Sequence, residues 1–195
     1  MVKKKVGASS QIRIIAGEWR GRKLPVAEVV GLRPTPDRVR ETLFNWLQFE
    51  VAGRRCLDAF AGTGALGAEA LSRGAAELVL LERDTKAVAH LRQHLLPLAG
   101  ERAQLIAQDA VHWLATAPVT PFDLVFLDPP FAAGLHQPAL DQLITRGWLA
   151  PSALVYLEQS ARQAEVILPA GWVEEKARQA GEVSYRLWRT PQVGS

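Results

Sequence analysis

The strongest constraint on the fold is an alternation of short apolar segments with longer amphipathic ones from residue 54 onward. The amphipathic segments, which begin near residues 65, 86, 110 and 138, have helical periodicity. Nearly continuous apolar strands separated by helices predict a parallel sheet with both faces covered. The expected strands are CLDAF (56–60), LVLLE (78–82), QLIAQ (104–108), FDLVFLD (122–128) and ALVYLEQ (153–159).

The C-terminal segment follows a different pattern. WVEEKARQA and EVSYRLWR alternate polar and apolar residues on either side of Gly181. Such alternation around a glycine predicts an antiparallel hairpin, which would bring the sheet to seven strands. We therefore expect an α/β fold with a doubly wound, mostly parallel, seven-stranded sheet that ends in an antiparallel hairpin.

The N-terminal segment predicts an arm in front of this sheet. IRIIAGEWRGRKL (12–24) alternates apolar and polar residues, which predicts a β-hairpin that turns at Gly17. A helix is expected to follow, with Asp37 as its N-cap. We divide the chain into a flexible basic tail (1–10), a hairpin arm with a helix (11–50) and the α/β domain (51–195).

The charge of the chain is unevenly distributed. The net charge is +3, but residues 1–55 hold 12 Lys or Arg and 5 Asp or Glu, so this part carries +7. A basic arm on a mildly acidic body favours a polyanionic partner such as nucleic acid. Arg20, Arg22 and Lys23 would share one basic face of the hairpin, and Trp19 is the tryptophan best placed to stack on a base.

Several classes of protein and site are disfavoured. No apolar run approaches a membrane span, and the N-terminus lacks the apolar segment of a secretory signal. The single cysteine, Cys56, cannot form an internal disulfide and is expected to be a small core thiol in a cytoplasmic, monomeric protein. His90 and His94 lie one helical turn apart without an evident third ligand, so we expect no metal. The lack of a long apolar run also leads us to expect no membrane partner.

A glycine-rich loop follows the first strand of the α/β domain. LDAFAGTGALG (57–67) has the spacing Gly62-x-Gly64-x-x-Gly67 of a nucleotide-binding turn. Asp58 precedes the glycines, where it would repel a pyrophosphate but could pair with a cationic amino-acid group. Glu82 ends the next strand, where an acid can accept hydrogen bonds from both ribose hydroxyls. This order of acid, glycines and acid describes S-adenosylmethionine better than a dinucleotide.

Asp109 admits two interpretations. It follows the third strand and could accept a hydrogen bond from the adenine amine, with the N–H of Ala110 reaching the ring. It is an equally good N-cap for the helix that follows.

The segment FLDPPF (126–131) ends the fourth strand with an acid, two prolines and an aromatic ring. Hydrogen bonds to Asp128 and to the carbonyl of Pro129 could orient the lone pair of a nucleobase amine towards an electrophilic methyl group. The two prolines fix the backbone, and Phe131 could stack on a base taken out of its helix. We interpret the segment as an amine clamp.

The chain resembles the bacterial 16S ribosomal RNA guanine-N2 methyltransferases, of the Rossmann-like class that uses S-adenosylmethionine, and in particular those that act on guanine 966. The resemblance runs from about Ile12 to Arg189 and is carried by RIIAGEWRGRKL and RPTPDRVRETLFN, which are specific to this family, together with the glycine loop and DPPF. It implies methylation of a guanine N2 amine in 16S RNA, on an assembled or partly assembled small ribosomal subunit.

The resemblance also implies roles for individual residues. The loop that contains Arg33 would close over cofactor and base, and Arg38 and Arg40 would face RNA together with Arg20, Arg22 and Lys23. Arg83 stands where an apolar residue usually packs on adenine, and its aliphatic stem can take that place. The amine clamp would comprise Asp128, Pro129, Pro130 and Phe131. The cofactor would be held by Asp58, Ala59, Gly62, Thr63, Gly64, Glu82, Arg83, Asp109 and Ala110.

Three alternatives remain at this stage. A DNA adenine-N6 methyltransferase uses the same clamp but usually carries a separate target-recognition domain, for which 195 residues leave no room. A protein glutamine methyltransferase favours Asn where Asp128 stands. A nucleic-acid-binding module on an inactive methyltransferase fold is disfavoured by the intact acids at Asp58, Glu82 and Asp128.

Overall fold

The computed structural model describes residues 11–27 and 36–192. The predicted tail at residues 1–10 lies outside the described residues. The helices are α1 (Asp37–Trp46), α2 (Ala65–Ser72), α3 (Thr85–His94), α4 (Leu96–Ala99), α5 (Ala110–Thr116) and α6 (His136–Thr145), with short 3-10 turns at Gly100–Arg102 and Phe131–Ala133. The strands are β1 (Gln11–Arg13), β2 (Lys23–Pro25), β3 (Arg55–Asp58), β4 (Glu77–Leu81), β5 (Ala103–Ile106), β6 (Phe122–Leu127), β7 (Leu149–Ser160), β8 (Val173–Ala180) and β9 (Val183–Arg189).

The main sheet of the described part of the chain has seven strands in the order β5-β4-β3-β6-β7-β9-β8. The five strands from β3 to β7 pair with one another in parallel. Strand β9 is antiparallel to both of its neighbours, β7 and β8. The predicted fold class is confirmed, including the C-terminal hairpin. The chain turns outward in opposite directions from β3 and β6, so the carboxyl ends of these two neighbours form the switch point of the sheet, where ligands bind in such folds.

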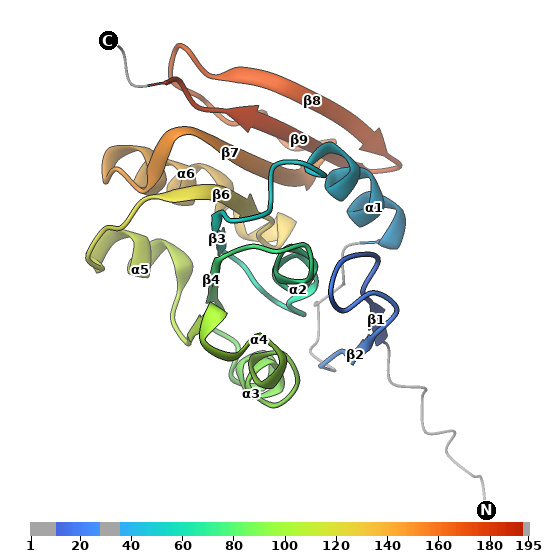
Figure 1. Ribbon diagram of the computed structural model, residues 1–195. Coiled ribbons are helices and arrows are strands. Elements are labelled where there is room, and N and C mark those ends of the chain that lie inside the picture. The colour runs from blue at the N-terminus through green and yellow to red at the C-terminus, as the bar shows by residue number, and fades with distance from the viewer. Residues whose placement is uncertain (1–10, 28–35, 193–195) are drawn as a thin grey trace, which may run out of the picture.

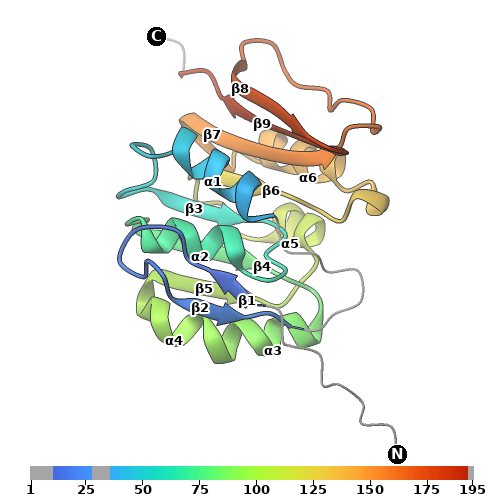
Figure 2. The same cartoon turned by 90° about the vertical axis from the view of Figure 1, so that its right-hand side faces the viewer.

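Helices cover both faces of the sheet. Figure 1 shows the arm, α1 and α2 on one side and α5 and α6 on the other, and Figure 2 gives the view onto the first side. The alternation of side chains along each strand produces this arrangement, because Cys56 packs in the core under α1 and α2 while its neighbour Leu57 packs in the core under α5 and α6. Burial raises the pKa of the Cys56 thiol to about 12, which agrees with the predicted inert core role.

The N-terminal hairpin, formed by β1 and β2, packs along α2. The buried carboxylate of Glu69 accepts hydrogen bonds from the backbone N–H groups of Ile15 (2.8 Å) and Ala16 (3.0 Å). Gly17 has φ +84°, and a Cβ atom there would lie 1.8 Å from the carbonyl oxygen of Ser72. The positive φ and the close approach to Ser72 both favour a residue without a side chain at this position, which explains why the hairpin turns at Gly17.

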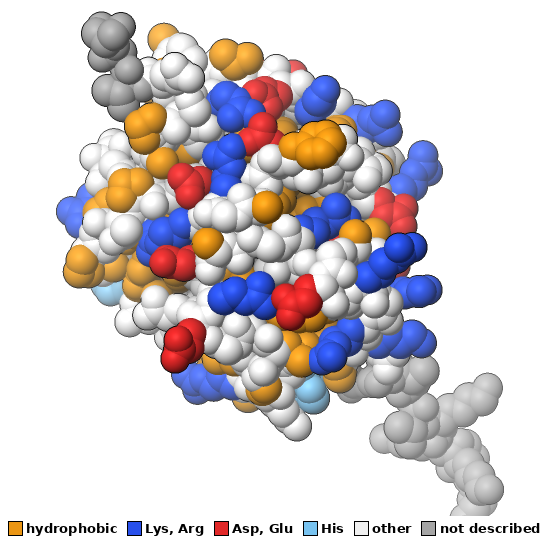
Figure 3. Space-filling view, viewed as in Figure 1, with side chains coloured by type: hydrophobic (Ala, Val, Ile, Leu, Met, Phe, Trp, Pro, Cys, Tyr) orange, Lys and Arg blue, Asp and Glu red, His pale blue; other side chains and the backbone are white. Residues whose placement is uncertain are grey.

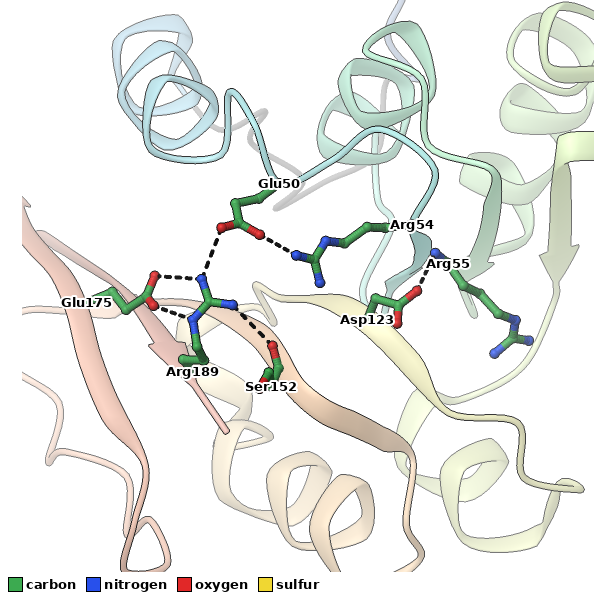
Figure 4. Close-up of polar contacts among 7 residues, drawn as sticks. All are labelled: Glu50, Arg54, Arg55, Asp123, Ser152, Glu175 and Arg189. Atoms are coloured by element: carbon green, nitrogen blue, oxygen red, sulfur yellow. Dashed lines mark hydrogen bonds and ion pairs between the residues drawn. The ribbon is translucent and has the colours of Figure 1, made fainter. Parts of the chain in front are cut away.

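The C-terminal hairpin is tied to the end of α1 by an ionic network (Figure 4). Arg189 at the end of β9 forms ion pairs with Glu175 on β8 and, at 3.1 Å, with Glu50 after α1. Its guanidinium also donates to the carbonyl of Ser152 at 3.3 Å. Because the hydrogen bonds that Arg189 donates to Glu175 favour the charged guanidinium, the pKa of Arg189 lies above its usual value. The network fixes the hairpin relative to the parallel strands.

Three predictions for the N-terminal segment are wrong. Asp37 is not an N-cap: Pro36 takes that position, and the Asp37 carboxylate accepts a hydrogen bond from Arg40 at 2.7 Å. Arg40 has no exposed side-chain surface, because its guanidinium turns inward and donates to the carbonyl of Arg13 at 2.9 Å. Trp19 is also buried, with Arg102 over its ring, and so cannot stack on RNA in this conformation.

Within residues 11–27 and 36–192, no helix has the length and apolar composition that a membrane crossing would need. The same residues contain no group of three or more His, Cys, Asp or Glu side chains arranged to hold a metal ion.

Candidate active site

A pocket of about 580 Å³ opens at the carboxyl ends of β3, β4, β6 and β7. Its walls bring together all the residues predicted for the cofactor except Gly64, and the whole of the predicted amine clamp. Segments far apart in sequence meet here because parallel strands present their carboxyl ends at one edge of the sheet. The predicted residues that line it are Asp58, Ala59, Gly62, Thr63, Glu82, Arg83, Asp109, Ala110, Asp128, Pro129, Pro130 and Phe131.

The glycine loop bends sharply between β3 and α2. Gly62 and Gly64 have φ values of +51° and +76°, which lie in the left-handed region that favours glycine. Gly67 serves a different purpose, since a Cβ atom there would lie 2.8 Å from Cδ2 of Leu78 in the sheet. The three glycines therefore form the turn and allow α2 to pack closely on the strands.

Asp58 is a buried carboxylate at the floor of the pocket. Its Oδ2 accepts a hydrogen bond from the backbone N–H of Gly67 at 3.1 Å. Burial raises the pKa of Asp58 to about 7; the Gly67 hydrogen bond acts in the opposite direction, and the nearby Glu82 raises the value further. A buried carboxylate in this state is stabilised in its ionised form by a cationic ligand group.

Glu82, just after β4, holds the loops on both sides of it. One oxygen accepts from the N–H of Gly62 (2.8 Å) and the other from the N–H of Asp84 (2.7 Å). Asp84 in turn caps α3 by accepting from Lys86 and Ala87. Each carboxylate oxygen has a second lone pair, so Glu82 can organise the loop and still accept from a pair of hydroxyls.

Asp109 is an N-cap, as one of its two interpretations predicts, and it also lines the pocket, so the adenine contact stays a prediction. It is the N-cap of α5, accepting from the N–H of His112 at 3.0 Å, and it lines the pocket. Its other oxygen lies 3.4 Å from Nη1 of Arg83, whose side chain is 64% exposed. Capping the helix occupies only one carboxylate oxygen, so the other oxygen of Asp109 can also interact at the pocket wall.

The segment Asp128–Phe131 forms the wall next to Asp58. Asp58 is the register partner of Phe126 on the neighbouring strand, so Asp128 follows two residues beyond it at the same edge. Pro129 is buried, and among the described residues no N–H group donates to its carbonyl. Phe131 is half-buried and begins a 3-10 turn. A carboxylate, a carbonyl acceptor and an aromatic ring thus stand on one side of the pocket.

Sequence reasoning missed a further acid in this wall. Glu158, in the C-terminal part of β7, is 4% exposed and lines the pocket. The sequence does indicate this acid, because Glu158 follows the apolar residues of ALVYLEQ just as Asp58, Glu82 and Asp128 follow the apolar residues of their strands. Phe60, Gln108 and Leu135 also contribute to the lining, without a comparable signal.

Basic side chains lie on the arm side of the molecule. Arg20, Arg22, Lys23 and Arg38 are exposed, whereas the buried Arg40 is wrongly predicted to contact RNA and Arg33 lies outside the described residues. Figure 3 shows Lys and Arg side chains along the right-hand edge of the molecule, where Figure 1 places the arm and α1. This edge is a candidate surface for a polyanion.

The order of the sheet, together with a pocket built on a glycine loop and strand-end acids, defines a Rossmann-like methyltransferase fold. A solved structure described as a putative methyltransferase from Escherichia coli superposes with a TM-score of 0.86 at 44% identity, covering 93% of this chain and 99% of that one. A putative methylase from Haemophilus influenzae gives a TM-score of 0.80 at 41% identity, covering 94% and 100%.

The chain belongs to the family described as conserved hypothetical protein 95, whose model matches residues 12–189. It is 46% identical over 194 residues to ribosomal RNA small subunit methyltransferase D of Escherichia coli K12, covering 100% of this chain and 98% of the relative. These relatives confirm the resemblance to bacterial small-subunit ribosomal RNA methyltransferases.

Proposed function

We propose that this protein transfers a methyl group from S-adenosylmethionine to the N2 amine of one guanine, guanine 966 by its resemblance, in 16S ribosomal RNA. The observation that carries the proposal is that Asp58, Glu82 and Asp128 converge on one pocket. The name of the relatives, ribosomal RNA small subunit methyltransferase, supports RNA as the substrate over DNA or protein. The substrate is an assembled or partly assembled small ribosomal subunit. The protein acts on it as a monomer in the cytoplasm.

The pocket residues fit this cofactor. Asp58 pairs with its ammonium group, because a buried carboxylate with a raised pKa gains most from a cation. Glu82 accepts from the two ribose hydroxyls, and Asp109 with the N–H of Ala110 contacts the adenine edge. The stem of Arg83 packs against the adenine face. When bound, S-adenosylmethionine supplies an electrophilic methyl group on a sulfonium centre.

The clamp residues act on the base. Asp128 and the Pro129 carbonyl accept hydrogen bonds from the two hydrogens of the amine, which turns the nitrogen lone pair out of the ring plane and towards the methyl group. Phe131 stacks on the extruded base, a contact worth about 1–3 kcal/mol. As the nitrogen–carbon bond forms and the sulfur–carbon bond breaks, the amine becomes acidic and Asp128 is positioned to receive its proton.

Small-subunit RNA from cells that lack this protein is expected to lose one N2-methylguanosine. Digestion of the RNA and mass spectrometry of the nucleosides would measure the loss, and mapping would identify the position. Wild-type protein should restore the modification, and an Asp128→Ala variant should not. An unchanged set of methylated nucleosides would refute the proposed function.

Cofactor affinity should decrease as the pH falls below about 7. In the free protein Asp58 is protonated below this pH, whereas pairing with the cofactor ammonium requires the ionised form. Binding must then release a proton, so Kd should rise about tenfold per pH unit well below the pKa. Titration calorimetry from pH 5.5 to 8 would measure this effect.

Asp58→Asn provides the control for this titration. The amide cannot ionise, so the variant should bind the cofactor more weakly at pH 8 and with little dependence on pH. A Kd of the wild-type protein that stays constant over the range would exclude Asp58 as the partner of the ammonium group.

A further inference from the structure

Glu158 occupies the position beside Asp128 on the neighbouring strand. Leu127 on β6 is the register partner of Leu157 on β7, so Asp128 and Glu158 follow one residue further along two adjacent parallel strands. Both residues line the same pocket. A second acid therefore lies next to the amine clamp, and it has no role in the proposed methyl transfer.

The protein holds the Glu158 carboxylate by one oxygen. The hydroxyl of Tyr156, which is fully buried, donates to Oε2 of Glu158 at 2.7 Å. Within the described residues Oε1 accepts no hydrogen bond. The pKa of Glu158 lies above its usual value because the carboxyl group is buried, and the hydrogen bond from Tyr156 acts in the opposite direction by favouring the ionised carboxylate. One oxygen of a buried acid is left for the pocket.

The backbone of Glu158 is fixed as well. Nε2 of the buried His136 lies 2.7 Å from the Glu158 carbonyl oxygen, and Nδ1 of that ring lies 3.3 Å from Nε2 of Gln163. Burial lowers the pKa of His136, so the ring is neutral and donates from Nε2 to the carbonyl. This contact joins α6 to the end of β7. The position of the carboxylate is therefore set by two independent hydrogen bonds.

The amine clamp alone cannot distinguish guanine from adenine. Both bases carry an exocyclic amine, but the ring nitrogen N1 beside it is a donor in guanine and an acceptor in adenine. Enzymes that take a base out of its helix identify it through hydrogen bonds to this edge. An ionised carboxylate only accepts hydrogen bonds, so at this place it suits guanine and repels the N1 lone pair of adenine.

We propose that Glu158 accepts the N1–H of the target guanine through Oε1 and thereby sets the specificity for guanine, with Tyr156 as its positioning residue. The inference rests on the proposed function and adds a specificity-determining residue to it. A base that lacks the N1–H would leave Oε1 of the buried carboxylate without a hydrogen-bond donor. Sites of this kind reject such analogues strongly, by about 10⁴-fold where the loss is complete.

The test uses two small-subunit particles that differ at the target base. One carries guanine, and the other carries 2-aminopurine, which keeps the amine at C2 but presents an acceptor at N1. Wild-type protein should prefer guanine by at least about 100-fold in kcat/KM. In Glu158→Gln the amide can donate to N1 of 2-aminopurine, so the preference should shrink at least about tenfold, with a slower reaction on guanine.

Two further variants serve as controls. Glu182→Gln makes the same change at an exposed glutamate that is paired only with Arg162 among the described residues, and should leave the preference unchanged. Tyr156→Phe should lower the rate on guanine and move the acid limb of its pH profile upward, because the ionised carboxylate loses its donor. Cofactor affinity, measured for each variant, reports on the integrity of the pocket.

The outcomes separate the two proposals. If wild-type protein methylates guanine but Glu158→Gln and Tyr156→Phe keep the full preference and pH profile, the role of Glu158 is refuted and the proposed function stands. If wild-type protein methylates neither particle, the proposed function fails, and the role of Glu158 fails with it.

Discussion

Asp128→Ala is expected to lower the rate of methyl transfer about 10³-fold or more while cofactor affinity stays within about twofold. Asp128 stands in the clamp wall of the pocket, whereas Asp58 and Glu82 carry the predicted contacts to the cofactor. Removing the carboxylate takes away the acceptor that orients the amine lone pair, an interaction that matters most in the transition state. Single-turnover rates on small-subunit particles, with calorimetry for the cofactor, would measure both quantities.

Two variants calibrate this loss. Asp128→Asn should retain part of the activity, because the amide oxygen still accepts a hydrogen bond from the amine. Asp123→Ala removes an acid at the opposite end of β6 from Asp128, where it accepts from the N–H of Arg55 at 2.8 Å (Figure 4). That variant should lose stability and keep its rate per folded molecule. A near-normal rate for Asp128→Ala would refute the clamp mechanism.

The parts of the site that the sequence predicts are those with local signals. The glycine turn needs positive φ values at Gly62 and Gly64, and few other residues adopt them, so glycines at this spacing between a predicted strand and a predicted helix indicate the turn. Acids at strand ends, such as Asp58 and Asp128, reach one pocket because a parallel sheet aligns its carboxyl ends. Both rules depend on neighbouring residues and on the class of sheet, and both are visible in one sequence.

The wrong predictions from the sequence concern residues whose surroundings are formed by distant segments of the chain. Trp19 is buried because the arm packs on α2, where the backbone N–H of Trp19 donates to the hydroxyl of Ser72, 53 residues away. Arg40 turns inward because the carbonyl of Arg13 lies beside α1, a contact that no periodicity within the helix can indicate. The same distant packing decides which basic side chains remain available, so the charge of the arm predicts a polyanion partner but not the contact residues.

The position of the arm fixes what its remaining basic residues can do. Ile12 and Val26 pack against Ala65 at the pocket end of α2, whereas Trp19 contacts Ser72 at the other end. Seven residue steps along a helix span about 10 Å. Arg20 and Arg22, beside Trp19, therefore lie at the far end of the arm from the pocket, so we expect them to contact phosphates of RNA that flanks the target and not the target itself.

Reversing the charge of Arg20 and Arg22 together is expected to reduce kcat/KM on small-subunit particles about 100-fold at physiological salt, without changing cofactor affinity. A plot of log kcat/KM against log salt concentration has a negative slope, and each lost phosphate contact should make this slope shallower by about 0.7–0.9. Such contacts position the RNA and carry little sequence information, so the shape of the RNA around the target must select one guanine among the many in 16S RNA. Wild-type activity should accordingly be higher on assembled or partly assembled particles than on protein-free 16S RNA.

Arg146→Glu is the matched control for each single reversal, since Arg146 is exposed at the end of α6 on the opposite face of the sheet and the change in net charge is the same. It should alter neither the rate nor the salt slope by as much as Arg20→Glu or Arg22→Glu. Equal effects of all three variants would mean that net charge, and not the arm, attracts the RNA. Equal wild-type rates on a short protein-free hairpin and on the particle would instead show that the enzyme reads the loop directly, because the shape of the particle would then contribute nothing.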